Sequence, residues 1–420
     1  MTQGYYAFFS GNKKYRRLWA ASVISLLGEW FNTIALFILI IEYSGSAFLL
    51  AVLPGLRMLL FAISQPINGL LADRLNRKSL MLWSNVIQVF LALSFILVDG
   101  KEDIWWMIAV SGVMMLLHGV YATAEKAALP NIVPDEDLIT ANAIGSASWS
   151  TALCFGAMLG GIVVELLGTD AAFIIDSFTF LISALILIPL TIEQKIDESM
   201  KGPILSSAIS NIVLGWKRIY REKRLLRIVF AKASWNIAGG GLVAFLVLAG
   251  KDIPGLGVAL GFGLFFFARG VGTGIGPILA RAMFKDRTKW PSLVGILVST
   301  SGFFYLLLGL TYPDCKSMEI YLPLTVSLII IAHAASGGNW VLSTVLTQSW
   351  VEDELRGRVF SMDMLILGVS AFISTLAAGY LVEYHDMTLK SGFTYFASIM
   401  VLSGILFTVW NPDDNHKQTG

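Results

Sequence analysis

A single carboxylate stands near the middle of the first long apolar stretch. Glu29 lies about midway between the charged flanks of this stretch. Its helical face carries Ser22, Ser25, Glu29 and Asn32. A charge at the centre of a bilayer costs roughly 2.5–3.5 kcal/mol on insertion scales, so Glu29 should face a cavity or a partner. Burial favours the protonated acid, as a proton carrier needs. The alternative is a structural acid held in a permanent ion pair.

Three other charged side chains interrupt apolar stretches. Arg57 and Arg269 can either pair with Glu29 or bind an anionic group of a substrate through the planar guanidinium. Asp176 shares a helical face with polar residues, and both a functional or gating role and a structural role are open to it. The residues predicted to line a transport cavity or to couple protons are Glu29, Asn32, Arg57, Asp176 and Arg269.

The composition places these residues in a membrane. Hydrophobic residues make up 56% of the 420 residues and charged residues only 14%, against about a quarter in soluble proteins. The mean hydropathy is +0.71. A net charge of +1 gives no reason to expect a nucleic-acid partner. The two cysteines, Cys154 and Cys315, lie in different surroundings, which makes a disulfide framework implausible.

Twelve apolar stretches reach the length of about 20 residues that a helix needs to cross the hydrocarbon. The sequence therefore predicts an all-α integral membrane protein with 12 transmembrane helices. Their expected limits are 18–41, 48–72, 79–98, 104–124, 141–166, 171–191, 227–250, 257–283, 291–311, 321–346, 359–383 and 391–410.

Basic residues are distributed unevenly between alternate loops. Of the 30 Lys and Arg residues, 23 fall in or beside the loops on the side of the N-terminus. The opposite side carries only Lys101, Lys251, Lys316 and Lys390. The positive-inside rule then predicts that both termini are cytoplasmic. The first stretch is too long for a signal peptide and lacks a cleavage site, so we expect it to be retained.

A polar segment divides the predicted helices six and six. A faint repeat relates Val133-Pro-Asp-Glu-Asp-Leu138, before helix 5, to Trp350-Val-Glu-Asp-Glu-Leu355, before helix 11. Duplicated six-helix halves are typical of secondary transporters. We therefore predict two pseudo-symmetric six-helix bundles, with an N-terminal segment 1–17, a bundle 18–191, a linker 192–226, a bundle 227–410 and a tail 411–420.

The loop between helices 2 and 3 carries a specific motif. Gly69-Leu-Leu-Ala-Asp73-Arg74-Leu-Asn-Arg77-Lys78 resembles the signature loop of the major facilitator superfamily. In such a loop, glycine permits close packing, the aspartate interacts with a helix N-terminus and the basic residues bridge to acids. Alternatively, the basic residues only satisfy the positive-inside rule. The predicted gating residues are Gly69, Asp73, Arg74, Arg77, Lys78, Glu125, Arg356, Arg358 and Asp363.

Two of these gating predictions involve specific pairs. Glu125, at the inner end of helix 4, is expected to pair with Arg74 or Arg77 and to hold the cytoplasmic side shut. Lys232 and Asp363 lie near the cytoplasmic ends of helices 7 and 11, where snorkelling and salt-bridge formation are both open to them.

Further motifs resemble one branch of this superfamily, the macrolide efflux proteins and the enterobactin exporter. They are Leu18-Trp19, Ser25-Leu-Leu-Gly28-Glu29-Trp30, Gly45-Ser46, Ala128-Leu-Pro130-Asn-Ile-Val-Pro134, Phe173-Ile-Ile-Asp176 and Arg356-Gly-Arg358-Val-Phe-Ser361. A predicted helix-packing motif of Gly156, Gly160 and Gly161 resembles the antiporter motif, with Ala157 in place of its proline. His118-Gly119 stands where many drug antiporters have an arginine.

The absence of two sequence motifs argues against two classes of protein, ATP-driven pumps and enzymes. No P-loop and no His-Glu-x-x-His occurs, so neither an ATP-driven pump half nor an enzyme is expected. We predict a secondary active transporter with alternating access and proton-coupled efflux of a small amphipathic compound that is drug-, macrolide- or siderophore-like. The resemblance alone implies export and multidrug resistance. A lysophospholipid flippase, an importer of a small polar solute and a receptor without transport are the alternatives.

The expected partners follow from this function. They are a small-molecule substrate, protons and the lipid bilayer, with no nucleic acid and no cofactor. A metal site is not expected, because the intramembrane acids and histidines do not cluster at ligand spacing. The short loops suit a monomer in a bacterial inner membrane.

Overall fold

The structure is a computed structural model that describes residues 5–194, 203–251, 253, 255–312 and 318–410. All regular elements in these ranges are helices, and 12 of them are long and apolar enough to cross a membrane. The predicted all-α membrane architecture is therefore confirmed. The predicted tail 411–420, residues 195–202 of the predicted linker, Cys315 and Lys316 lie outside the described residues.

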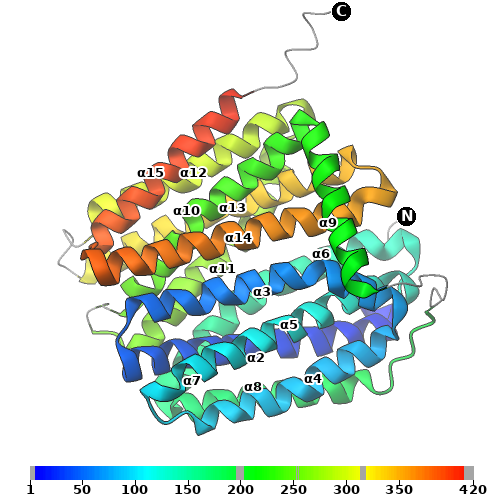
Figure 1. Cartoon of the computed structure of the whole chain (residues 1–420), viewed down its shortest axis with the longest axis horizontal. Coiled ribbons are helices and arrows are strands. Elements are labelled where there is room, and N and C mark those ends of the chain that lie inside the picture. The colour runs from blue at the N-terminus through cyan, green and yellow to red at the C-terminus, as the bar shows by residue number, and fades with distance from the viewer. Residues whose placement is uncertain (1–4, 195–202, 252, 254, 313–317, 411–420) are drawn as a thin grey trace, which may run out of the picture. The chain divides into compact units, whose positions relative to one another are not determined.

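The helices follow one another with short connections (Figure 1). Span 5 consists of α6 and α7 joined by a π-helix at Ala152–Gly156. The α-helices are α1 Tyr5–Gly11, α2 Lys13–Ser44, α3 Ala47–Arg74, α4 Arg77–Ser94, α5 Ile104–Ala128, α6 Leu138–Thr151, α7 Ala157–Leu167, α8 Thr169–Leu187, α9 Ile204–Arg221, α10 Lys223–Lys251, α11 Val258–Met283, α12 Trp290–Thr311, α13 Met318–Trp350, α14 Asp353–His385 and α15 Leu389–Val409.

The first spanning helix, α2, is longer than hydropathy alone suggests. It begins at Lys13 because the side chain of Asn12 accepts a hydrogen bond from the backbone N–H of Tyr15 at 3.0 Å and so caps the first turn. It ends at Ser44 because Gly45 adopts the left-handed conformation with φ 63°. The added turns place the basic residues at its start within the helix.

Contacts divide the chain into two compact units. The first comprises Met1–Gly45 and Ile63–Ala208, and the second Ser46–Ala62 and Ile209–Gly420. The boundary falls inside α3, so the first part of this helix belongs to the second unit and its end to the first.

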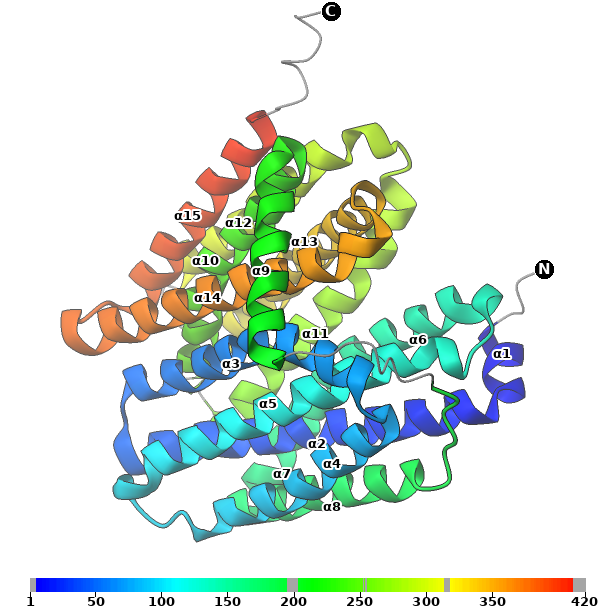
Figure 2. The same ribbon diagram turned by 45° about the vertical axis from the view of Figure 1, so that its right-hand side comes forward.

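In the first unit, α2 packs against α7 and α8, and α4 packs against α5 and α8 (Figures 1 and 2). An apolar cluster gathers at one end of these helices, with Phe8, Tyr15, Leu18, Met81 and Tyr121 among its buried members. The phenol of Tyr15 donates a hydrogen bond to the backbone carbonyl of Ala141 at 2.9 Å. The cluster thus ties the start of α2 to α4, α5 and α6.

In the second unit, α12 packs against α13 and α15, α11 against α13, and α10 against α14 and α15. Glycines line the contact between α12 and α15. A Cβ at Gly302 would lie 2.8 Å from the backbone nitrogen of Val401 and 2.9 Å from the Cβ of Met400. The two backbones therefore approach too closely for any larger residue at this position.

Helix α9 lies outside the set of spanning helices and docks on the start of α14. A Cβ at Gly215 would lie 2.3 Å from the carbonyl oxygen of Arg358. Arg218 donates hydrogen bonds to Glu352 at 2.8 and 3.2 Å, to Glu222 at 2.6 Å and to the carbonyl of Trp350 at 3.0 Å. One arginine therefore fastens α9 to the connection between α13 and α14.

The glycine contact between α12 and α15 gives a first prediction. Gly302→Ala is expected to lower the free energy of unfolding by about 1–3 kcal/mol, because the added methyl overpacks a backbone contact. The measurement is thermal unfolding of the purified protein in detergent. Gly145→Ala is the matched control, since no atom lies within 4 Å of its Cβ position. Equal losses in the two variants would contradict the account.

The attachment of α9 should depend on pH. Hydrogen bonds from the Arg218 guanidinium hold the pKa of Glu352 below its usual value. A lowered pKa means that this attachment is present at neutral pH and is lost only as the pH falls below the ordinary pKa of a glutamate side chain. Hydrogen–deuterium exchange of α9, corrected for intrinsic rates, should therefore speed up on acidification. Glu352→Gln should exchange faster already at neutral pH, with a weaker pH dependence; an unchanged profile would refute the attachment.

Candidate functional site

The first unit holds Glu29 beside a histidine. The carboxylate of Glu29, on α2, lies 3.3 Å from Nδ1 of His118 on α5. The exposed fractions of the two side chains are 20% for Glu29 and 24% for His118. This acid and its neighbour are therefore reachable by solvent or by a ligand while they lie in the middle of their spans. A carboxylate and an imidazole in contact can share or exchange a proton.

The second acid of the first unit is placed differently. Asp176, on α8, is fully buried, and its carboxylate accepts a hydrogen bond from the side-chain amide of Asn32 at 2.8 Å. The amide of Asn85 donates to the hydroxyl of Ser183 at 2.8 Å farther along α8. Of the predicted cavity residues, Asn32 and Asp176 therefore form one buried pair, and Glu29 lies in another, more open environment.

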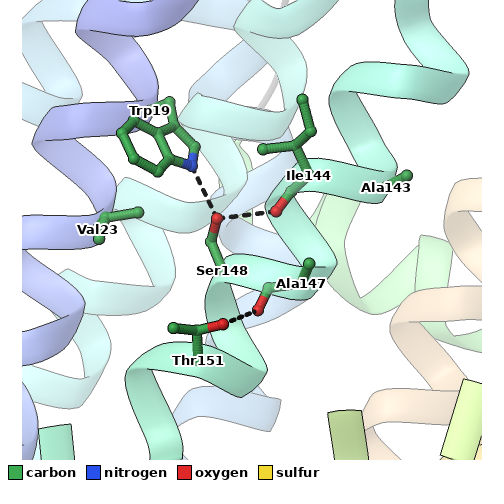
Figure 3. A pocket seen from close by; sticks show the side chains of 7 residues that line it. All are labelled: Trp19, Val23, Ala143, Ile144, Ala147, Ser148 and Thr151. Atoms are coloured by element: carbon green, nitrogen blue, oxygen red, sulfur yellow. Dashed lines mark hydrogen bonds between the residues drawn. The ribbon is translucent and has the colours of Figure 1, made fainter. Parts of the chain in front are cut away.

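A pocket of about 390 Å³ lies between α2 and α6 (Figure 3). It is mainly apolar, and it is lined by Trp19, Val23, Ala143, Ile144, Ala147, Ser148 and Thr151. The indole N–H of Trp19 donates a hydrogen bond to the hydroxyl of Ser148 at 2.7 Å, which in turn donates to the carbonyl of Ile144 at 2.8 Å. An apolar wall with a few fixed polar groups is suited to an amphipathic small molecule.

The π-helix follows this pocket along span 5. Its last residue, Gly156, and Gly160 of α7 both face α2. A Cβ at Gly156 would lie 3.0 Å from the indole of Trp30, and one at Gly160 would lie 3.1 Å from the Cα of Phe31. Gly161 is also buried. The predicted packing glycines thus lie where α7 approaches the segment of α2 that follows Glu29.

Arg77 connects three helix ends of the first unit. It lies 3.6 Å from Asp73 and donates hydrogen bonds to the carbonyls of Ala72 and Ala127 and to the side chain of Asn131. Lys78 donates to the carbonyl of Ile188. The loop that begins near Gly69 is therefore tied to the ends of α3, α5 and α8.

Glu125 lies on α5, one turn before its end. Its side chain lies near that of Ser22 on α2. Its expected pairing with Arg74 or Arg77 stays a prediction.

The second unit contains a buried ion pair. Lys232, on α10, binds the carboxylate of Asp363 on α14, with exposed side-chain fractions of 3% and 0%. The ammonium also lies 4.8 Å from the ring centroid of Trp340 on α13. Asn236 donates a hydrogen bond to the carbonyl of Leu367 at 3.2 Å, one turn farther along both helices. Of the two possibilities left open for Lys232, snorkelling and a salt bridge, the structure shows the salt bridge, because Asp363 and Trp340 hold its ammonium inside the bundle.

The other predicted basic residues are spread over the second unit. Arg57 is buried on the first part of α3, and Arg269 is partly buried on α11 with its guanidinium 5.7 Å from the ring of Phe266. Arg356 and Arg358 lie on the first turns of α14. Near Arg269, the phenol of Tyr305 hydrogen-bonds Nε2 of His333 at 2.7 Å.

Arg227, the first residue of the predicted bundle 227–410, is a structural residue that the sequence analysis did not single out. It is 1% exposed and donates hydrogen bonds to the carbonyls of Phe407 and Thr408 at 2.9 and 3.2 Å. A cation at these carbonyls caps the C-terminus of α15. Within the described ranges, no group of three His, Cys, Asp or Glu side chains is arranged to hold a metal ion.

Comparison with known proteins identifies the family. The model of the Major Facilitator Superfamily matches residues 18–315. The chain belongs to this superfamily. The transporter is 24% identical over 416 residues to the MFS-type transporter YfiS of Bacillus subtilis, with 95% of this chain and 93% of that protein covered. It is 21% identical over 360 residues to macrolide efflux protein A of Streptococcus pyogenes, with 85% and 86% covered.

Solved structures agree with this fold. A peptide transporter of the POT family in complex with alafosfalin superposes with a TM-score of 0.75 at 12% sequence identity. The comparison covers 100% of this chain and 98% of that one. At this identity the likeness concerns the fold, a multi-pass membrane transporter with 12 candidate spans.

The buried ion pair gives a prediction about stability. Lys232→Met leaves the Asp363 carboxylate buried without its cation and is expected to cost about 3–5 kcal/mol. The double variant Lys232→Met/Asp363→Leu should recover most of this loss, because it removes both charges. Lys289→Met is the matched control, since its partner Asp286 is exposed and such a pair contributes at most about 1 kcal/mol. Thermal unfolding separates the cases; a double variant as unstable as the single one would rule out charge burial as the cause.

Proposed function

We propose that this transporter moves a small amphipathic compound out of the cytoplasm in exchange for protons, and that the proton binds at the Glu29–His118 pair. The contact of 3.3 Å between these two side chains, partly open and in the middle of their spans, carries the proposal. The two predicted bundles, 18–191 and 227–410, are the bodies that alternate, and both termini lie in the cytoplasm.

The pair suits proton exchange because its charge can change inside the membrane. A deprotonated Glu29 is stabilised by a hydrogen bond or a positive charge from His118. When a proton neutralises the carboxylate, the energetic cost of moving the site through the apolar interior falls. The buried Asp176 is less suited, because Asn32 fills its surroundings and solvent does not reach it. We assign Asp176 and Asn32 a positioning role for α2 and α8.

Substrate class and direction are supported by different observations. The apolar pocket beside Trp19 and Ser148 fits an amphipathic molecule better than a strongly polar one. Export is inferred from the relatives, one of which is named as a macrolide efflux protein. Arg57 and Arg269 are the groups to which an acidic part of the substrate would bind. The signature loop, Glu125, Arg356, Arg358 and Asp363 are assigned to gating.

Proton coupling is tested with purified protein in liposomes that contain a pH-sensitive dye. Macrolides, siderophores and lysophospholipids are added in turn, and proton movement and substrate movement are both recorded. Glu29→Gln is expected to abolish substrate-driven proton flux while exchange of labelled substrate for unlabelled substrate continues. His118→Gln should weaken the flux and shift its pH dependence, because the imidazole modulates the acid and does not replace it.

Glu165→Gln serves as the matched control, since this acid of α7 is exposed at the end of its helix. Full proton flux in Glu29→Gln would refute the assignment of the proton site. Transport of lysophospholipid without any proton flux in the wild type would favour a lipid flippase instead.

A further inference from the structure

Helix α9 presents three different faces. One face is apolar and buried against the protein, with Ala208, Gly215 and Ile219. The next face is apolar and exposed, and its members are Ile209 at 53%, Val213 at 44%, Trp216 at 37% and Tyr220 at 67%. Ser210, Lys217 and Arg221 form a third face, which is exposed and mainly polar but also carries Leu214 at 37%. The helical period of 3.6 residues places the exposed apolar face between the protein and the polar face.

The orientation of α9 explains how such a face can be covered. Figures 1 and 2 show α9 running across α14, whereas the spanning helices of the second unit run alongside one another. Gly215 and Arg218 hold it against the first turns of α14 and the connection before them. Because α14 crosses the membrane, a helix that runs across its end lies along the membrane surface.

We propose that α9 is an interfacial helix that binds the anionic phospholipid surface at this end of α14. Its exposed apolar face enters the boundary between headgroups and acyl chains. Its polar face contacts lipid phosphates through Lys217 and Arg221, and Lys223 at the start of α10 adds a third exposed cation. The helix contains no Asp or Glu, and its cations, Lys217, Arg218 and Arg221, all lie in its last five residues, so positive charge gathers at this end of the helix.

The exposed apolar face of α9 is better suited to contact with lipid than to contact with water. Four large side chains in sequence positions 209, 213, 216 and 220 are too many to leave in solvent on one short helix. Trp216 and Tyr220 lie at its C-terminal part, and their rings are 6.1 Å apart. Aromatic rings with one polar group are typical of the headgroup level of a bilayer. The inference does not depend on the substrate or on proton coupling.

Site-directed spin labelling of the full-length transporter tests this placement. Cysteines are introduced one at a time at 209, 210, 213, 216, 217, 220 and 221, with Cys154 and Cys315 replaced by alanine. The labelled variants are reconstituted in vesicles of phosphatidylglycerol and phosphatidylcholine. The measurement is the accessibility of each label to oxygen, which partitions into the bilayer, relative to a water-soluble nickel chelate.

The ratio of oxygen to nickel accessibility should follow the helical period, with high values for Val213→Cys and Trp216→Cys and low values for Ser210→Cys and Lys217→Cys. Phe303→Cys, on the exposed side of α12, provides the reference for a lipid-facing label. In vesicles of phosphatidylcholine alone, or with Lys217→Gln/Arg221→Gln, the ratio at position 216 should fall.

Several outcomes would overturn the proposal. Uniformly high nickel accessibility would place α9 in water. Low accessibility to both reagents, with spin–spin broadening, would show that a second copy of the chain covers this face. An oxygen signal that is identical in anionic and zwitterionic vesicles would remove the specificity for anionic lipid.

Discussion

The hydrocarbon interior offers no hydrogen bonds, so every charged or polar side chain within a span must find its partner inside the protein. This requirement orders the buried interior of the transporter. Asp176 meets it through Asn32, Lys232 through Asp363 and Trp340, and Arg227 through the last carbonyls of α15. Each contact joins two or more helices and therefore also fixes their rotation about their own axes.

The buried pairs and the Glu29–His118 contact differ in their exposure to solvent. The buried acids Asp176 and Asp363 are closed to solvent. Glu29 and His118 are also within contact distance, but both keep part of their surface open. The two units differ further: the open acid belongs to the first, and Arg57 and Arg269 belong to the second.

Hydropathy predicted the 12 spans because span length depends only on local composition and on the thickness of the bilayer. The family followed from a motif whose residues are adjacent in sequence. The partners of the charged residues could not be predicted in this way. Whether Glu29 meets His118 or an arginine depends on the rotation of α2 against α5, which the side chains of several helices decide together. His118 carried a signal, since the resemblance to drug antiporters predicts an arginine at its position, but Arg227 looked like any other basic residue beside the linker.

The division of α3 has a consequence for the order in which the chain becomes structured. The second unit needs Ser46–Ala62 as well as residues that follow 209. The carboxylate of Glu383 accepts hydrogen bonds from Ser46 and from the backbone of Phe48, 337 and 335 residues earlier. During synthesis, the start of α3 is made long before α14. The contact between these two helices can therefore form only after α14 has been made. The second unit thus includes one of the first segments to be made, and a chain cut at the linker would yield a second half without the first part of α3.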